Sequence, residues 1–188
     1  MTRRVLFIVG SFRKDSLNAQ LAKLVAKVIG ERAEISYLQF DELPFFHQDL
    51  EEPVLPEVAR VRQAVEEADV LWIFSPVYNH AIPGSVKNLL DWLSRSLDLS
   101  DTRGPSVLFE KLVTVSSVSK GKGAYQYVFE DYQKLLSFIR MEVIEPFTGI
   151  SVSTESYEAI TQAMSARYSL LEEQIATLLA VIDEKKKG

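Results

Sequence analysis

A polar stretch near the N-terminus, Gly10 to Asn18, has the residue types that bind a phosphate group. It reads Gly-Ser-Phe-Arg-Lys-Asp-Ser-Leu-Asn and leads into a segment with helical periodicity. Hydroxyl and amide side chains, the Arg13 guanidinium and the free N–H groups of a helix N-terminus together favour an anion. The stretch lacks G-x-G-x-x-G and G-x-x-x-x-G-K-S/T, which disfavours a dinucleotide fingerprint and a P-loop NTPase. The alternative interpretation is that Ser16 only caps the helix and that Arg13 is solvated.

A second polar stretch, Ser75 to Gly84, places an aromatic ring and an amide between two prolines. The prolines restrict the backbone, Tyr78 supplies an aromatic face, and the Asn79 amide both donates and accepts hydrogen bonds. These residues could bind the edge of a flat heteroaromatic ring. The same residues also occur in ordinary turns. We expect His80 to be a solvated polar residue rather than an acid or a ligand.

A third stretch, Ser116 to Gly123, offers serine hydroxyls and backbone N–H groups that glycine leaves accessible. It is expected either to contact the same ligand or to form a flexible loop. Each of the three stretches directly follows a short apolar run, so the fold decides whether they meet.

Five short apolar runs rich in β-branched residues alternate with longer segments of helical periodicity. The runs are Val5–Val9, Ile35–Leu38, Val70–Phe74, Leu112–Val115 and Val143–Ile144. The longer segments carry apolar stripes at three- and four-residue spacing, including one C-terminal helix from Ile160 to Ile182 whose stripe contains Tyr168. We interpret these stripes as core. The alternation predicts parallel strands joined by crossover helices.

These elements predict an α/β fold, a flavodoxin-like three-layer sandwich with helices on both faces of a five-stranded parallel sheet of order 2-1-3-4-5. The six-stranded dinucleotide-binding order would need one more strand. A chain of 188 residues can bury about 70% of its surface in one core, so we expect residues 1–188 to form a single domain. Ligands bind such sheets at the carboxyl ends of the strands, which would bring the three polar stretches together.

Composition narrows the classes of partner and site. The chain has 21 basic and 26 acidic residues and a formal charge of −5, and no segment has the Lys/Arg density that nucleic acid requires. The chain has no cysteine, which excludes thiolate chemistry. Its two histidines are too few to serve as the ligands of a catalytic zinc. The longest apolar run near the N-terminus is too short for a signal sequence or a membrane span. We therefore expect a cytoplasmic protein without nucleic-acid, membrane or metal partners.

The first two stretches resemble the NAD(P)H-dependent FMN reductase family, which includes quinone, azo-dye and chromate reductases. The family pattern G-S-x-R-x-x-S-x-N matches residues 10–18, and P-x-Y-N-x-x-I-P-G-x-x-K-N-x-x-D-W-L-S-R matches residues 76–95. Residues 43–50 also look like the family segment that follows the second strand. The resemblance extends over residues 3 to 150 and leaves out the C-terminal helix.

The resemblance implies an FMN-dependent oxidoreductase that transfers hydride from NADPH or NADH, through bound FMN, to a quinone, azo compound, chromate or free flavin. The residues implied to hold the FMN phosphate are Ser11, Arg13, Ser16, Leu17 and Asn18. Those implied to line the isoalloxazine are Pro76, Val77, Tyr78 and Asn79, with Ser116 meeting the flavin from the third stretch. Since the chemistry takes place at the flavin, no catalytic side chain is implied. A homodimer, or a tetramer, is expected because family members cover the flavin with a neighbour's residues.

Two features depart from the family pattern. Val77 stands where the family often has an acidic residue, so only the backbone can make a polar contact at that position. The segment from Ser96 to Glu110 is longer than the family's usual connection, and we expect it to border the substrate pocket or a subunit contact.

Two other functions share the predicted fold. A flavodoxin-like FMN electron carrier without NAD(P)H activity is usually strongly acidic, which a charge of −5 and basic residues around the predicted site match poorly. A signalling receiver would need an acidic cluster at the ends of the first and third strands, where this chain has Gly10-Ser11 and Ser75-Pro76.

Overall fold

The fold is built around a parallel β-sheet with the strand order β2-β1-β3-β4-β5. The computed structural model describes residues 2–154 and 156–187. The strands are β1 (Arg4–Val9), β2 (Glu34–Tyr37), β3 (Val70–Phe74), β4 (Leu112–Lys120), β5 (Glu142–Val143) and β6 (Thr148–Val152). All of these strands pair in parallel, which confirms the predicted flavodoxin-like order.

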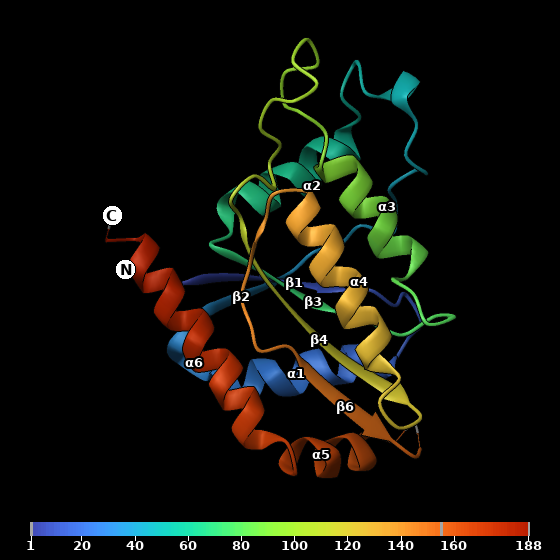
Figure 1. Cartoon of the computed structure of the whole chain (residues 1–188), viewed down its shortest axis with the longest axis vertical. Coiled ribbons are helices and arrows are strands. Elements are labelled where there is room, and N and C mark those ends of the chain that lie inside the picture. The colour runs from blue at the N-terminus through green and yellow to red at the C-terminus, as the bar shows by residue number, and fades with distance from the viewer. Residues whose placement is uncertain (1, 155, 188) are drawn as a thin grey trace.

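Two layers of helices cover the sheet, as Figure 1 shows. They comprise α1 (Leu17–Ile29), α2 (Pro56–Glu67), α3 (Gly84–Leu93), α4 (Tyr125–Phe138), α5 (Tyr157–Ser165) and α6 (Tyr168–Lys185), with short 3-10 turns η1 (Gly30–Arg32) and η2 (Gln48–Leu50). Helices α1, α5 and α6 pack on one face of the sheet, and α2, α3 and α4 pack on the other. The predicted three-layer sandwich is therefore confirmed.

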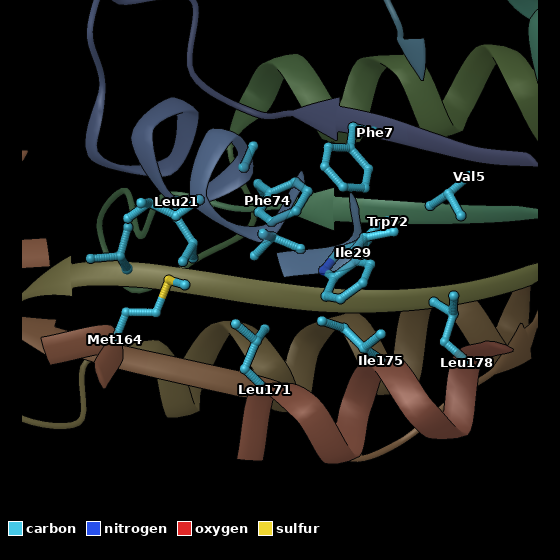
Figure 2. Packing of buried hydrophobic residues seen from close by; sticks show 14 of the residues in the cluster. Val5, Phe7, Leu21, Ile29, Trp72, Phe74, Met164, Leu171, Ile175 and Leu178 are labelled. Carbon is cyan, nitrogen blue, oxygen red and sulfur yellow. The ribbon is translucent and has the colours of Figure 1, made fainter. Parts of the chain in front are cut away.

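Aromatic side chains of β1 and β3 fill the core beneath α1 and α6 (Figure 2). Phe7, Trp72 and Phe74 are fully buried. The rings of Phe7 and Phe74 meet edge to face with centroids 4.7 Å apart, and Trp72 stacks on Phe74 at 5.6 Å. Leu21 of α1 and Ile175 of α6 close the two sides of this cluster. The strands that end at the polar stretches are thus fixed by close packing.

The edge of the sheet beside β4 differs from the prediction. Both β5 and β6 pair with β4, one after the other, and the register shifts between them because more residues separate Val143 from Thr148 than separate Val113 from Ser116. The sixth strand was missed because Pro146 precedes it and Gly149 interrupts its apolar residues, a pattern that indicates a loop.

The C-terminal segment is two helices rather than one. Helix α5 ends at Ser165 and α6 begins at Tyr168. Most of the predicted stripe is buried, but Tyr168 is 48% exposed and its hydroxyl donates to the Glu172 carboxylate over 2.8 Å. The prediction that Tyr168 belongs to the core was wrong, because the break between the helices turns that ring toward the surface.

Strand β4 is longer than predicted, and this moves Ser116 out of the third loop. The Ser116 hydroxyl accepts from Trp72 Nε1 over 3.0 Å and donates to Gln174 Oε1 over 3.1 Å. Gln174 in turn donates to Thr114 Oγ1 over 2.7 Å, and all four residues are buried. Ser116, expected in a loop, is therefore a strand residue whose hydroxyl Trp72 and Gln174 satisfy within the core.

Candidate functional site

A cavity of about 940 Å³ opens at the carboxyl ends of β1, β3 and β4. The strand order reverses beside β1 at this point, which is where open α/β sheets bind ligands. All of the predicted site residues except Ser116 line the cavity, namely Ser11, Arg13, Ser16, Leu17, Asn18, Pro76, Val77, Tyr78 and Asn79. The structure thus brings the first two polar stretches together.

The third wall of the cavity comes from residues beyond Ser116. Because Ser116 lies inside the sheet with its hydroxyl paired to Trp72 and Gln174, it does not reach the cavity. The wall is formed by Val118, Ser119, Lys120, Gly121, Lys122, Ala124 and Tyr127. The third stretch is therefore at the site, but the predicted residue is not.

Close packing of three elements fixes the start of the first loop. The Gly10 N–H donates to the Phe74 carbonyl over 2.9 Å, and the Ser85 hydroxyl donates to the Gly10 carbonyl over 2.9 Å. A Cβ on Gly10 would lie 2.8 Å from Val86 Cγ2 and 3.0 Å from Pro76 Cδ. Only glycine fits here, because β1, the second loop and α3 approach one another too closely for a side chain.

Helix α1 points its N-terminus at the cavity. Ser16 caps it, since its hydroxyl accepts from the Ala19 N–H over 3.1 Å, as the alternative interpretation of the sequence proposed. The N–H groups of Leu17 and Asn18 have no acceptor within the helix, because an α-helix leaves its first N–H groups unpaired. A helix N-terminus that faces a cavity favours an anionic group there.

The Asn18 side chain joins α1 to β4. Its Nδ2 donates to the Val118 carbonyl over 3.1 Å, and its Oδ1 accepts from the Val118 N–H over 3.0 Å. Asn18 is 2% exposed. Its side chain therefore positions the helix N-terminus, and its backbone N–H is the group that faces an anion.

A tight turn in the second loop presents an aromatic ring and an amide. The Ala81 N–H donates to the Tyr78 carbonyl over 3.0 Å. Between them Asn79 and His80 have φ of 52° and 59°, the left-handed conformation of both central residues in a type I′ turn. The Tyr78 hydroxyl lies 3.1 Å from Ser11 Oγ and links this turn to the first loop.

A buried hydrogen-bond chain supports the beginning of the second loop. The Tyr132 hydroxyl of α4 donates to Ser75 Oγ over 3.0 Å, and Ser75 Oγ donates to the Pro76 carbonyl over 3.0 Å. Burial raises the pKa of Tyr132, so its hydroxyl stays a neutral donor. These hydrogen bonds link the start of the second loop to α4 and so hold the loop at the end of β3.

The cavity wall is basic. Arg13, Lys120 and Lys122 line it, and none of the lining side chains that the structure describes is acidic. Side chains of one sign around a concave site raise the local concentration of ions of the opposite sign. The cavity therefore favours an anionic ligand at its first and third walls.

Ser119 carries a buried hydroxyl that faces the cavity without a partner. The residue is 6% exposed, and its Oγ forms no hydrogen bond within the described part of the chain. Buried hydroxyls in proteins nearly always have a partner, and a bound polar molecule is one way of providing it. Ser119 thus marks a position where a ligand atom would be accommodated.

His80 and Tyr127 line the cavity although neither was predicted for it. His80 is exposed, as expected, but it lines the cavity and meets the ring of Tyr127. Tyr127 lies on α4, and the only signal in the sequence was an aromatic residue on the polar side of that helix shortly after a glycine-rich loop.

The segment from Ser96 to Glu110 folds away from the cavity. The Arg140 guanidinium at the end of α4 donates to the Gly104 carbonyl over 2.6 Å, and the Leu97 N–H donates to the Pro105 carbonyl over 3.1 Å. None of its residues lines the described cavity. Of the two expected neighbours, the lining of this cavity does not support the substrate pocket, and a subunit contact stays a prediction.

Residues 2–154 and 156–187 contain no helix long and apolar enough to cross a membrane. In the same ranges, no three His, Asp or Glu side chains are grouped so that they could hold a metal ion.

The chain is similar in sequence to quinone reductases. A 2-hydroxy-1,4-benzoquinone reductase from Burkholderia sp is 40% identical over 96 residues, 50% of this chain and 52% of the relative. An NAD(P)H:quinone oxidoreductase from Solanum tuberosum is 34% identical over 125 residues, 64% of this chain and 60% of the relative. The chain thus spans between half and two thirds of the length of these curated relatives.

A solved structure shares the fold over nearly the whole chain. The flavoenzyme NAD(P)H:(acceptor) oxidoreductase FerB from Paracoccus denitrificans has a TM-score of 0.76, 23% identity, and coverage of 97% of this chain and 98% of that chain. Independently, the family model described as NADPH-dependent FMN reductase matches residues 3–154, which include all three walls of the cavity. This chain belongs to the NADPH-dependent FMN reductase family.

Proposed function

We propose that this chain is an FMN-dependent oxidoreductase that transfers hydride from NADPH or NADH, through bound FMN, to a small acceptor. Quinones are the acceptor class that the names of its relatives favour. The observation that carries the proposal is one cavity that joins a basic helix N-terminus to a rigid turn bearing Tyr78 and Asn79. A flavin mononucleotide has the same two parts, a phosphate and a flat ring.

The phosphate would be held at the first wall. Arg13 provides a positive charge there, and the backbone N–H groups of Leu17 and Asn18 provide donors. Ser16 and the side chain of Asn18 act indirectly, because one caps the helix and the other fixes it to β4. The residues present therefore fit a monophosphate.

The flavin ring would lie against the second wall. Pro76 and Val77 offer backbone groups, and the hydrogen bond between Tyr78 and Ser11 holds the aromatic side chain in place. Bound FMN supplies the hydride chemistry, so the protein's contribution is to fix distance and to exclude water. The unpaired Ser119 hydroxyl gives the third wall a polar contact for the same ligand.

The test is the colour and redox behaviour of the purified protein. We expect a yellow protein with one FMN per chain whose flavin absorbance bleaches when NADPH is added without oxygen. A protein that stays colourless and does not bind added FMN would overturn the proposal. A yellow protein that NADPH and NADH leave oxidised would support the electron carrier instead. Steady-state rates with quinones, azo dyes, chromate and free FMN then rank the acceptors.

A homodimer is part of the proposal, and one surface supports it. Phe138 of α4 is 84% exposed, and it borders a shallow apolar surface. That surface is lined by Ala81, Ile82, Lys87, Asp131, Lys134, Leu135 and Phe138. Two lysines and one carboxylate, Asp131, surround an apolar centre, and charges of both signs on one surface suit a two-fold interface between identical chains.

The dimer surface adjoins the cavity, because Ala81 closes the same turn that carries Asn79 and His80. A second copy seated there would cover the cavity mouth. Phe138→Asp should convert a dimer to a monomer in analytical ultracentrifugation, whereas Leu170→Asp on α6 should not. A parent protein that is monomeric at micromolar concentration and active would contradict this. We also propose a cytoplasmic location, in keeping with the absence of cysteine.

A further inference from the structure

His80 and Tyr127 form a paired wall at the cavity that the binding of FMN does not explain. They come from different elements, the turn of the second loop and helix α4. Their rings meet edge to face, with centroids 4.6 Å apart and planes at 89°. Tyr127 is 56% exposed, so one face of its ring is accessible in the cavity.

The turn does not need a histidine at position 80. Its φ of 59° is left-handed, a conformation that glycine and asparagine adopt at lower cost. Strained backbone with a large side chain tends to occur where the side chain has a role at a site. The contact between the imidazole and Tyr127 is the interaction that this arrangement produces.

The Tyr127 ring is held at the cavity by its helix. Two residues earlier, the ring of Tyr125 packs on Gly149 of β6, where a Cβ would lie 2.1 Å from Tyr125 Cδ2. Tyr125 also contacts Phe129 with centroids 5.4 Å apart. Because these two side chains anchor the first turns of α4 to the edge of the sheet, Tyr127 is fixed on the cavity side of the helix.

We propose that Tyr127 and His80 dock the planar ring of the molecule that exchanges hydride with the flavin, with a quinone as the favoured ligand. This inference rests on the proposed function. A quinone is an uncharged, electron-poor ring with carbonyl oxygens, so it can stack on the tyrosine face and accept a hydrogen bond from an imidazole N–H. The lysines of the third wall match phosphates, whereas this pair matches a neutral ring. The nicotinamide ring has a similar shape and a carbonyl, and the experiment includes it as a second arm.

Binding without turnover is the direct test. Menadione is titrated into the oxidised FMN-loaded protein without NADPH, and the flavin absorbance reports the dissociation constant. Tyr127→Leu should weaken menadione binding about 3- to 10-fold, the range of an aromatic contact. Tyr127→Phe keeps the ring and should stay within about two-fold of the parent on the same grounds. His80→Gly, which suits the left-handed backbone, should weaken binding about three-fold or more through the lost hydrogen bond.

Controls separate a docking role from a structural one. Tyr168→Leu, an exposed tyrosine on α6, should leave menadione binding unchanged. At saturating NADPH, the KM for menadione should rise in Tyr127→Leu and stay at the parental value in Tyr127→Phe and Tyr168→Leu. The same titration with NADP⁺ decides whether the nicotinamide ring shares the subsite.

The outcomes are distinct. Weaker menadione binding in Tyr127→Leu, with NADP⁺ binding changed or unchanged, supports the proposal. A parent that binds FMN and is reduced by NADPH, but whose Tyr127→Leu and His80→Gly variants bind menadione normally, overturns the subsite alone. A parent that binds no FMN, or that NADPH does not reduce, overturns the proposed function and the subsite together.

Discussion

Two serines of β4 differ in their hydrogen bonding: Ser116 lies in the core and Ser119 lies at the cavity. Ser116 lies beneath α6 and both accepts from Trp72 and donates to Gln174. Ser119 lies on the opposite face of the strand, since side chains alternate, and its hydroxyl has no partner in the described structure. A buried polar residue therefore marks a site when its hydrogen-bonding groups have no partner in the protein. The core should therefore respond to substitution through stability, and the cavity through ligand binding.

The largest loss of stability is expected from removing one aromatic ring from the core. Phe7→Ala should lower the free energy of unfolding by about 3–5 kcal/mol, because it removes a fully buried ring and leaves a cavity. Urea unfolding followed by circular dichroism measures this. The folded fraction should still bind FMN with parental affinity. A change in FMN affinity as large as the change in stability would break the separation between the two regions.

Removing the glutamine of the core network should come next. Gln174→Leu removes the acceptor of the Ser116 hydroxyl and the donor to Thr114 Oγ1. Ser116 still accepts from Trp72 and Thr114 still donates to the Ile144 carbonyl, so we expect a total cost of about 1–3 kcal/mol. Glu173→Leu, at the adjacent exposed position of α6, serves as the control and should change stability by less than about 0.5 kcal/mol. Equal stabilities of the two variants would mean that the network is not needed.

The fold was predictable where short apolar runs alternate with helical periodicity, because burial on both faces of a parallel sheet leaves that pattern in the sequence. The pattern fails at the sheet edge. The paired residues of β6 include Thr148, Gly149 and Ser151, and its pairing depends on the neighbouring end of β4. A strand whose partner is more than 30 residues away leaves no local signal when its own residues are polar or small.

The first two walls of the cavity were predictable because each is a continuous stretch that follows a strand. For the third wall, the sequence predicted the stretch but not which of its residues reach the cavity. Ser116 and Ser119 look alike in sequence, and the length of β4 and the position of Gln174 decide which one is at the cavity. Tyr127 reaches the site because of how α4 packs, which no local pattern reports.

Arg13→Ala should lower the affinity for FMN without lowering the stability of the fold. Loss of a charge-assisted contact of about 1.5–3 kcal/mol would raise the FMN dissociation constant roughly 10- to 150-fold at low salt. Lys14→Ala, the next residue and not part of the cavity lining, is the matched control and should bind FMN normally. Equal FMN affinities in the two variants would remove Arg13 from the phosphate site.

Ser119 is expected to give the smallest change in affinity. Ser119→Ala should leave stability unchanged, since its hydroxyl has no protein partner to lose, and should weaken FMN about five-fold through one hydrogen bond of about 1 kcal/mol. Ser117→Ala removes an equally buried and unpaired hydroxyl that does not line the cavity, so FMN binding should not change. Fluorescence titration with FMN measures both. The same affinity in both variants would show that Ser119 does not contact the ligand.

In the proposed function, one end of the cavity holds the cofactor while the turn of Tyr78 and Asn79 places its ring for hydride transfer. Stopped-flow reduction by NADPH without oxygen tests this in the double variant Tyr78→Ala with Asn79→Gly, in which glycine suits the left-handed φ. We predict that the variant retains FMN and is reduced about 100-fold more slowly, because an error near 1 Å in ring placement costs that much in rate. A variant that is reduced as fast as the parent would contradict this role and would leave the turn with no part in the reaction.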